Sequence, residues 1–219
     1  MIAYRTLTEV YQFEDNQFVF QEKLPFTVKA VTSRPEDLLL FTDTAVISYA
    51  KRVSLLDFPA PIQHVQFAND LFFVSCRNQL MVYSMDFSLV CSHAMVFDIS
   101  SIAVHATEGS SIDRVLRVER VIVAVSEWIS NKLTMFLLSQ QQLTAVFSED
   151  YTMGIKSMVF TLVEQASLFY CLLNHIDGGI RILKHSAEQW TEDKYVTLFP
   201  CCNVVPHDCS SWRMGFFTD

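Results

Sequence analysis

Apolar and polar residues follow one another along this chain in a pattern that recurs at least three times. Each repeat has an apolar run, a polar break, a longer apolar run, a tight turn, an alternating run and another break. The three stretches that show it best are VKAVTSRPEDLLLFTDTAVISYAKRVSLLDF, HVQFANDLFFVSCRNQLMVYSMDFSLVC and KSMVFTLVEQASLFYCLLNHIDGGIRILKH. The step from Val28 to Val65 is about the 40 residues of one β-propeller blade. Because such units bury their faces by stacking on copies of themselves, the pattern predicts a scaffold.

The pattern predicts four consecutive blades of four strands each. The strands are expected at 27–31, 38–42, 45–49 and 53–56 in the first blade, at 63–67, 71–75, 80–83 and 88–91 in the second, at 101–105, 121–125, 133–138 and 143–147 in the third, and at 157–162, 168–173, 180–183 and 195–198 in the fourth. The second strand of each blade is almost wholly apolar, which is typical of a strand buried on both faces. The third strands alternate more, which predicts a position nearer the rim.

The predicted fold is all-β: a partial β-propeller of about four WD40-like four-stranded antiparallel blades. Residues 1–22 have the pattern of trailing strands of a blade, residues 23–199 hold the consecutive blades, and residues 200–219 form an irregular tail that clusters Cys with Pro. The chain thus begins in mid-pattern, as a piece of a longer protein would. A closed propeller has about 4 to 8 blades, so either further chain completes the ring or the blades form an open fragment.

The composition fits a folded β protein. The chain is 51% hydrophobic and 18% charged, which excludes an intrinsically disordered protein. It has 18 Phe, a residue that favours pleated, half-buried surfaces. It has 5 Gly, few for a protein with many turns. We therefore expect Asn, Asp and Ser to fill turns such as 67–70 and 76–79.

Charge and cysteine content indicate which kinds of partner and which cellular compartment to expect. The net charge of −8 disfavours contact with the negatively charged backbone of a nucleic acid, so we expect no direct nucleic-acid binding. The N-terminus has no secretory pattern, and no apolar run reaches the roughly 20 residues of a membrane helix. Cys76, Cys91 and Cys171 fall in or beside predicted strands as small apolar residues. A reducing compartment, cytosol or nucleus, fits these free thiols.

Residues 121–184 carry a motif with a family resemblance. An apolar strand ends Ala124-Val125-Ser126-Glu127-Trp128, a strand begins Ser157-Met158-Val159, and a third segment reads YCLLNHIDG over 170–178. This order resembles the large β-propeller proteins that include the large subunit of the UV-damaged-DNA-binding complex, the large subunit of the cleavage and polyadenylation specificity factor, and a splicing factor 3b subunit. The earlier blades are similar to the same middle region of that family more loosely.

The resemblance implies a role in protein assembly. In the damaged-DNA-binding member the middle propeller docks a cullin and links substrate receptors to a ubiquitin ligase in DNA repair, in the nucleus and cytoplasm. In the RNA-processing members the equivalent propeller is architectural, and in no member is it an enzyme. The position matching the family's Trp is Trp128, which with Glu127 and Ser130 forms the candidate partner-binding site. No catalytic residue, metal or cofactor is implied.

Two clusters have the residue types of a chemical site. Cys201, Cys202, His207 and Cys209 are zinc-ligand types, but adjacent cysteines rarely bind one ion and a second pair is missing. His175 and Asp177 could form an acid–base pair, yet no nucleophile motif or phosphate-binding glycine loop accompanies them. The run Asp177-Gly178-Gly179 is better explained as hairpin turn chemistry.

Other candidates have a structural and a functional interpretation. The acidic pairs at 14–15 and 149–150 are interpreted as solvated turns. Trp128 is either a buried packing residue or a partner contact, whereas Trp190 is expected to pack within a blade. The insertion at 106–117 is a solvated loop or a partner contact.

Two further functions stay open from the sequence. One is a propeller from a trafficking or nuclear-pore coat protein, which would normally be followed by helical repeats. The other is a propeller enzyme, which would need polar groups converging at the central channel, and the strand pattern names none.

Overall fold

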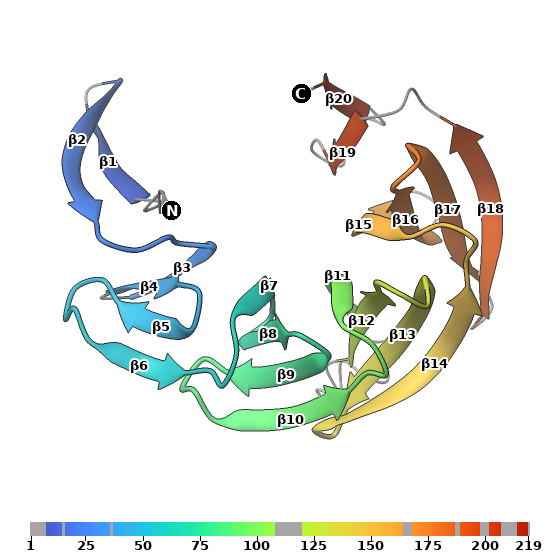
Figure 1. Cartoon of the computed structure of the whole chain (residues 1–219), viewed down its shortest axis with the longest axis horizontal. Helices are drawn as coiled ribbons and strands as arrows, with labels where there is room; N and C mark the ends of the chain where they lie inside the picture. Colours follow the sequence, from blue (N-terminus) through green and yellow to red (C-terminus); the bar gives the residue numbers. More distant parts are fainter. Residues whose placement is uncertain are drawn as a thin grey trace, which may run out of the picture. The chain divides into compact units, whose positions relative to one another are not determined.

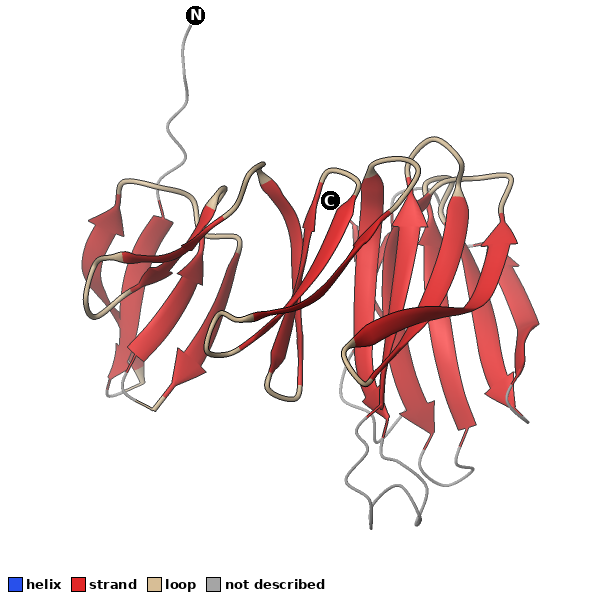
Figure 2. Ribbon diagram, turned by 90° about the horizontal axis from the view of Figure 1, so that it is seen from below, coloured by secondary structure: helices blue, strands red, loops and turns tan. Residues whose placement is uncertain are grey.

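A computed structural model describes residues 8–14, 16–35, 37–107, 120–163, 168–186, 189–197, 202–206 and 214–218. These residues form strands, turns and loops without a helix (Figures 1 and 2). Within them there is accordingly no helix with the length and apolarity needed to cross a membrane. The chain divides into two compact units, Met1–Val65 and Gln66–Asp219.

The strands pair into four four-stranded and two two-stranded antiparallel sheets. Their bounds are β1 Thr8–Glu14, β2 Gln17–Leu24, β3 Ala30–Arg34, β4 Asp37–Phe41, β5 Ala45–Ser48, β6 Ser54–Asp57, β7 Ile62–Ala68, β8 Leu71–Cys76, β9 Gln79–Ser84, β10 Leu89–Ala94, β11 Ile99–Thr107, β12 Arg120–Glu127, β13 Lys132–Ser139, β14 Gln142–Asp150, β15 Ile155–Val163, β16 Leu168–His175, β17 Gly179–Ser186, β18 Gln189–Thr197, β19 Cys202–Pro206 and β20 Met214–Thr218. The four-stranded sheets are β3–β6, β7–β10, β11–β14 and β15–β18, each ordered as in the chain. This arrangement is that of consecutive propeller blades.

Burial along the strands confirms one part of the predicted blade and corrects another. The second strands are buried on both faces, as predicted: all five residues from Val121 to Val125 in β12 are buried. The third strands lie between the second and fourth strands, nearer the rim than the second as predicted, but their alternating sequence does not expose one face, because Leu80–Tyr83 of β9 and Leu133–Phe136 of β13 are buried as well. The fourth strands β6, β10 and β14 are largely exposed, since they have no outer neighbour in their sheets.

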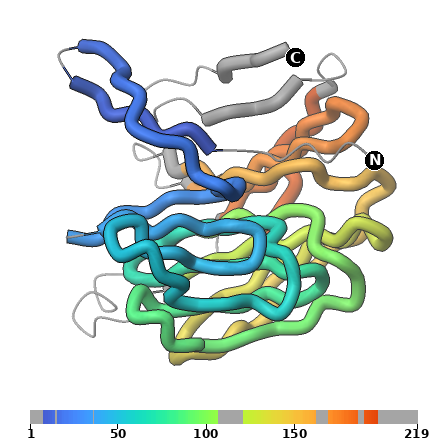
Figure 3. Tube along the Cα trace, turned by 60° about the vertical axis from the view of Figure 1, so that its left-hand side comes forward, coloured from blue at the N-terminus to red at the C-terminus, as the bar shows by residue number. Residues whose placement is uncertain are grey.

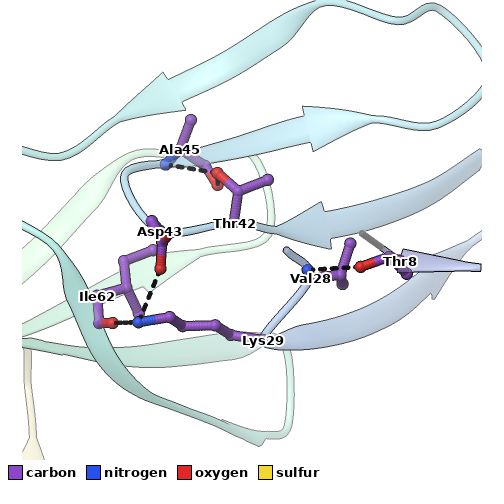
Figure 4. Close-up of polar contacts among 7 residues, drawn as sticks. All are labelled: Thr8, Val28, Lys29, Thr42, Asp43, Ala45 and Ile62. Carbon is purple, nitrogen blue, oxygen red and sulfur yellow. Dashed lines mark hydrogen bonds and ion pairs between the residues drawn. The ribbon is translucent and has the colours of Figure 1, made fainter. Parts of the chain in front are cut away.

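The first unit holds the β1–β2 hairpin and the β3–β6 sheet. Polar contacts fix the segment between them (Figure 4): the backbone N–H of Val28 donates to Thr8 Oγ1 at 3.0 Å. Lys29 Nζ lies 3.0 Å from Asp43 Oδ1 and also donates to the carbonyl of Ile62. The regular strand β3 begins at Ala30 and not at the predicted residue 27, although the backbone N–H of Lys29 still donates to the carbonyl of Phe41 in β4 at 2.7 Å.

In the second unit, neighbouring sheets pack face to face. One core joins the β7–β10 and β11–β14 sheets through Phe73, Val82, Val123 and Phe136, among others. A second core joins β11–β14 to β15–β18, with Met135 at its centre. Burying each large side chain contributes about 1.5–3 kcal/mol. Stacking of sheet on sheet is how propeller blades are stabilised.

Several turns place residues other than glycine in the left-handed backbone region. Asn69, in the turn at 67–70, has φ of 52° as expected, whereas in the turn at 76–79 the residue in this region is Arg77, with φ of 53°, and not Asn78. Asn131 has φ of 52°. Asn tolerates this region because its short amide bonds locally. The few glycines are therefore compatible with tight turns.

The fold prediction is confirmed: the described residues form a partial β-propeller with four four-stranded blades. The pair β19–β20 lies within residues 200–219, where the sequence shows no regular strand pattern. The domain boundaries at residues 22 and 199 stay predictions. Cys76, Cys91 and Cys171 lie in strands, as expected, and none of the three is in a disulfide bond.

Candidate functional site

Five connections of the second unit form a row, which we call the loop face. They are the turns and loops at 77–78, 95–98, 128–131, 151–154 and 176–178, which follow β8, β10, β12, β14 and β16. In each sheet the second and fourth strands run in the same direction, so their connections lie on the same side. The row is therefore a direct consequence of the repeated four-stranded topology.

Backbone hydrogen bonds join each connection of the loop face to the next. The donor and acceptor residues are Ile99 and Arg77 (2.9 Å), Trp128 and Asp98 (3.0 Å), Tyr151 and Asn131 (3.2 Å), and Ile176 and Gly154 (3.0 Å). Loops that bond to their neighbours in this way lose little further conformational freedom when a partner binds. The loop face is thus a preformed surface.

Large apolar side chains project from the loop face into solvent. Their exposed fractions are Val96 80%, Trp128 52%, Ile129 75%, Met153 38% and Ile176 58%. These residues sit in turns and loops, where no strand pairing requires an apolar side chain. Exposed apolar side chains on one face, with a tryptophan among them, are typical of a protein-binding surface.

Charged side chains are also exposed on or beside the loop face. Arg77, Asp98 and Asp177 are exposed within the five connections, and Lys156 is exposed two residues after Gly154. A polar rim of both signs around apolar residues is the usual anatomy of a protein interface.

The three residues singled out from the sequence have different surroundings. Trp128 is half exposed on the loop face, whereas Glu127 is 2% exposed. Glu127 Oε1 accepts the backbone N–H of Phe97 at 2.9 Å, and Oε2 accepts the Ser130 hydroxyl at 2.8 Å. Ser130 Oγ in turn accepts the N–H of Lys132 at 3.3 Å. Glu127 and Ser130 hold the turn that carries Trp128, and their contact with a partner stays a prediction.

Gly154 lets two connections of the loop face approach each other. A Cβ at this position would lie 3.3 Å from Asn131 Oδ1 and 3.6 Å from Ile176 Cδ1. The first distance is tighter than ordinary van der Waals contact. A larger side chain would push the 151–154 loop away from its two neighbours.

A buried histidine supports the same loop. His175 is 3% exposed, and its Nδ1 lies 3.1 Å from the carbonyl oxygen of Met153. The Tyr151 ring meets the imidazole edge-on at a centroid distance of 5.4 Å. Burial lowers the pKa of His175 below its ordinary value. A neutral imidazole that donates from Nδ1 to Met153 O satisfies this geometry.

The turn after β16 has the hairpin chemistry expected from its sequence. Asp177 Oδ1 accepts the N–H of Gly179 at 2.9 Å, and Gly178 has φ of 81°. The Asp177 carboxylate is therefore engaged within its own turn, while His175 bonds to Met153. Trp190 packs in the blade as expected, with its ring 5.5 Å from that of Phe169.

A recess of about 330 Å³ lies elsewhere in the second unit, beside β15. Its polar lining residues are Gln66, Ser157 and Asn174, and the others are apolar, including Phe160. None of the lining residues ionises near neutral pH. Asn174 Nδ2 donates to Ser157 Oγ at 3.3 Å, so two of the polar groups bond to each other.

The acidic pair at 149–150 is exposed as expected, but it lies at the end of strand β14 and not in a turn. The other sequence candidates lie outside the described side chains: the four tail residues Cys201, Cys202, His207 and Cys209, and residues 108–117 of the insertion. Among the described residues no three His, Cys, Asp or Glu side chains gather as metal ligands.

Sequence reasoning found only one of the five apolar residues of the loop face. Val96, Ile129, Met153 and Ile176 were missed because they lie in connections between strands, where the strand pattern makes no prediction. The signal that could have found them is their shared position, after the second or fourth strand of a blade.

Comparison with known proteins supports the fold. No protein-family model matches the chain, and no curated protein matches it in sequence. Among solved structures, Hsv2 of Kluyvelomyces marxianus is similar with a TM-score of 0.54 and 12% identity, over 90% of this chain and 61% of that one. The fission yeast complex of the SREBP and SCAP binding domains is similar with a TM-score of 0.57 and 10% identity, over 82% and 53%.

The WD40 domain of SCAP from fission yeast is similar by itself, with a TM-score of 0.56 and 9% identity, over 78% of this chain and 44% of that one. This chain therefore spans between 44% and 61% of the length of these structures. At such identities the likeness concerns the fold alone. The chain has the fold of part of a WD40-type β-propeller.

Proposed function

We propose that this chain is a protein-interaction scaffold that binds a protein partner through the loop face. The observation that carries the proposal is the row of hydrogen-bonded connections that exposes Val96, Trp128, Ile129, Met153 and Ile176. The propeller fold supports it, since stacked blades hold loops rigidly. We assign no catalytic residue, metal or cofactor, and the net charge of −8 favours protein partners over nucleic acid.

We further propose, from the motif over 121–184, a place in the family of the damaged-DNA-binding and cleavage-factor propellers. In this proposal the partner is the N-terminal region of a cullin, and the protein is an adaptor of a ubiquitin ligase in DNA repair, in the nucleus and cytoplasm. Trp128 lies both in the motif and on the loop face, so the two lines of reasoning meet at one residue.

A binding experiment with purified cullin N-terminal region tests both levels of the proposal. The full chain is immobilised, and the Trp128→Ala and Ile129→Ser variants are compared with Val146→Ser, which alters an equally exposed apolar residue of β14. We expect binding by the wild type and by Val146→Ser, and a loss of tenfold or more in affinity for the first two variants.

The possible results test the proposed binding surface and the proposed cullin partner separately. No binding of the cullin by the folded wild type would contradict the adaptor role. Polyadenylation or splicing subunits that co-purify with the tagged wild type, but not with Trp128→Ala, would support the loop face as the binding surface. They would indicate a role in RNA processing instead of DNA repair. If Trp128→Ala and Ile129→Ser bind the same partners as the wild type with equal affinity, the proposal that partners bind through the loop face is wrong.

A further inference from the structure

The β1–β2 hairpin of the first unit has half the strands of a blade. Figures 1 and 3 show β1 and β2 side by side at the blue end of the chain. One edge of β1 pairs with β2 along its whole length, from Thr8 opposite Leu24 to Glu14 opposite Gln17. No strand among the described residues pairs with its other edge. The backbone groups of such an edge are a template for a further strand.

One face of the hairpin is aromatic and exposed. Tyr11 and Phe20 meet edge-on at 5.8 Å, and Phe13 and Phe18 lie 5.1 Å apart. Side chains two apart on a strand share a face, so the four rings form one patch. Their exposed fractions run from 49% at Tyr11 to 75% at Phe18. Because an isolated two-stranded hairpin is marginally stable in water, such a patch indicates a missing contact.

The opposite face already has a partner in the same unit. A register shift leaves Gln21 unpaired, so that Glu22 pairs with Val10 while Phe20 pairs with Tyr11. Glu22 therefore shares the face of Val10, and its side chain points away from the aromatic rings. Its carboxylate accepts the Tyr49 hydroxyl at 2.5 Å and pairs with Arg52. The hairpin is thus attached to the β3–β6 sheet by one face. Its aromatic face and the outer edge of β1 remain available for a further contact.

We propose that β1 pairs with β1 of a second copy of this chain, antiparallel about a twofold axis at Tyr11. The result is a four-stranded sheet in the order β2–β1–β1–β2, the strand number of the complete blades. A self-pairing edge is the simplest closed interface, because the same surface serves both copies. The two aromatic patches then form one continuous face of eight rings, two copies of the four in each hairpin.

The sequence of β1 suits this register. With Tyr11 at the axis, Thr8 lies opposite Glu14 of the second copy, and Glu9 lies opposite Phe13 of the second copy. No carboxylate faces another, which matters because like charges directly opposite destabilise a strand pair. Glu9 is also neutralised within its own chain by Lys23 at 2.9 Å. All seven residues of β1 take part without overhang.

Sedimentation of the full chain tests the pairing. We expect the mass to rise with concentration from 25.1 kDa toward twice that value. Tyr11 opposes itself across the axis, so Tyr11→Lys and Tyr11→Glu each place like charges face to face. We expect each variant alone to weaken association tenfold or more, and an equimolar mixture of the two to associate as a heterodimer.

The mixture distinguishes a lost contact from misfolding, because two misfolded variants would not associate with each other as a heterodimer. Val146→Lys and Val146→Glu, at an exposed apolar residue of β14, are matched controls and should associate like the wild type. A wild type that stays monomeric up to about 100 µM overturns the proposal and means that another segment or another protein covers β1. Association unchanged by both Tyr11 variants also overturns it, because the contact then lies elsewhere.

Discussion

The carboxylate of Glu127 accepts a hydrogen bond from the backbone N–H of Phe97, 30 residues earlier, with 2.9 Å between Oε1 and N. This bond links the turn after β12 to the loop before β11. Next in the sequence after Glu127 is Trp128, whose own N–H donates to Asp98 O at 3.0 Å in the same loop as Phe97. The position of the exposed tryptophan therefore depends on the buried side chain of the residue before it.

Replacing Glu127 with Ala should lower the free energy of unfolding. The change leaves the Phe97 N–H and the Ser130 hydroxyl without their acceptor, and a buried unsatisfied group costs about 1–3 kcal/mol. Glu127→Gln keeps one acceptor oxygen and should cost less. Urea unfolding measures both, with Asp150→Ala in the exposed strand β14 as the control. Equal stability of Glu127→Ala and the control would show that the bonds do not matter to the fold.

Replacing Gly154 with Val should disturb the loop face more than Gly154→Ala does. The Cβ alone would press on Asn131 Oδ1 at 3.3 Å, and the two added methyl groups must find room between Asn131 and Ile176. Overpacking of this kind costs about 1–3 kcal/mol. Thermal unfolding gives the cost, and Thr152→Val, at an exposed residue of the same loop, provides the control. A Val variant as stable as the wild type would mean that the loop relaxes freely.

Stability should fall as the pH drops below about 6.5, the ordinary pKa of histidine. Burial lowers the pKa of both His175 and His105 in the folded state, so the unfolded chain takes up protons first. Their contribution is complete above the unfolded pKa and is lost as the pH falls toward the folded one. Urea unfolding at several pH values should show a shallower fall for His175→Gln and for His105→Gln. An unchanged slope in both variants would assign the pH dependence to other groups.

Cys171 should resist alkylation in the folded protein. Its side chain is 0% exposed in the core between the third and fourth blades, and burial raises the pKa of the thiol. Both effects remove the reactive thiolate. Iodoacetamide labelling at neutral pH, mapped by mass spectrometry of peptides, should find Cys171 modified only after addition of urea. Rapid labelling without denaturant would mean that this core opens readily.

The strand order follows from local patterns that the sequence carries. Apolar runs such as 71–75 and 121–125 predicted β8 and β12 within two residues at each end, because a strand buried on both faces must be continuously apolar. The rim strand β18 was expected only near 195–198 but spans Gln189–Thr197. Its residues QWTEDKYVT are mostly polar, since an outer strand needs backbone pairing more than an apolar core.

The candidate sites could be located only from the tertiary structure. Trp128 could be named from its motif, yet only the pairing of strands brings it into one row with Val96 and Ile176. Likewise, the sequence predicts a β1–β2 hairpin, but which of its faces contacts the β3–β6 sheet depends on the Glu22 contacts with Tyr49 and Arg52.

The sequence by itself therefore determined the blade repeat and most of its strands, since alternation and apolar runs are properties of neighbouring residues. The tertiary structure decided which loops share a side and which apolar groups stay exposed. Both depend on contacts between residues distant in the chain, such as Glu127 with Phe97. No local pattern encodes those contacts.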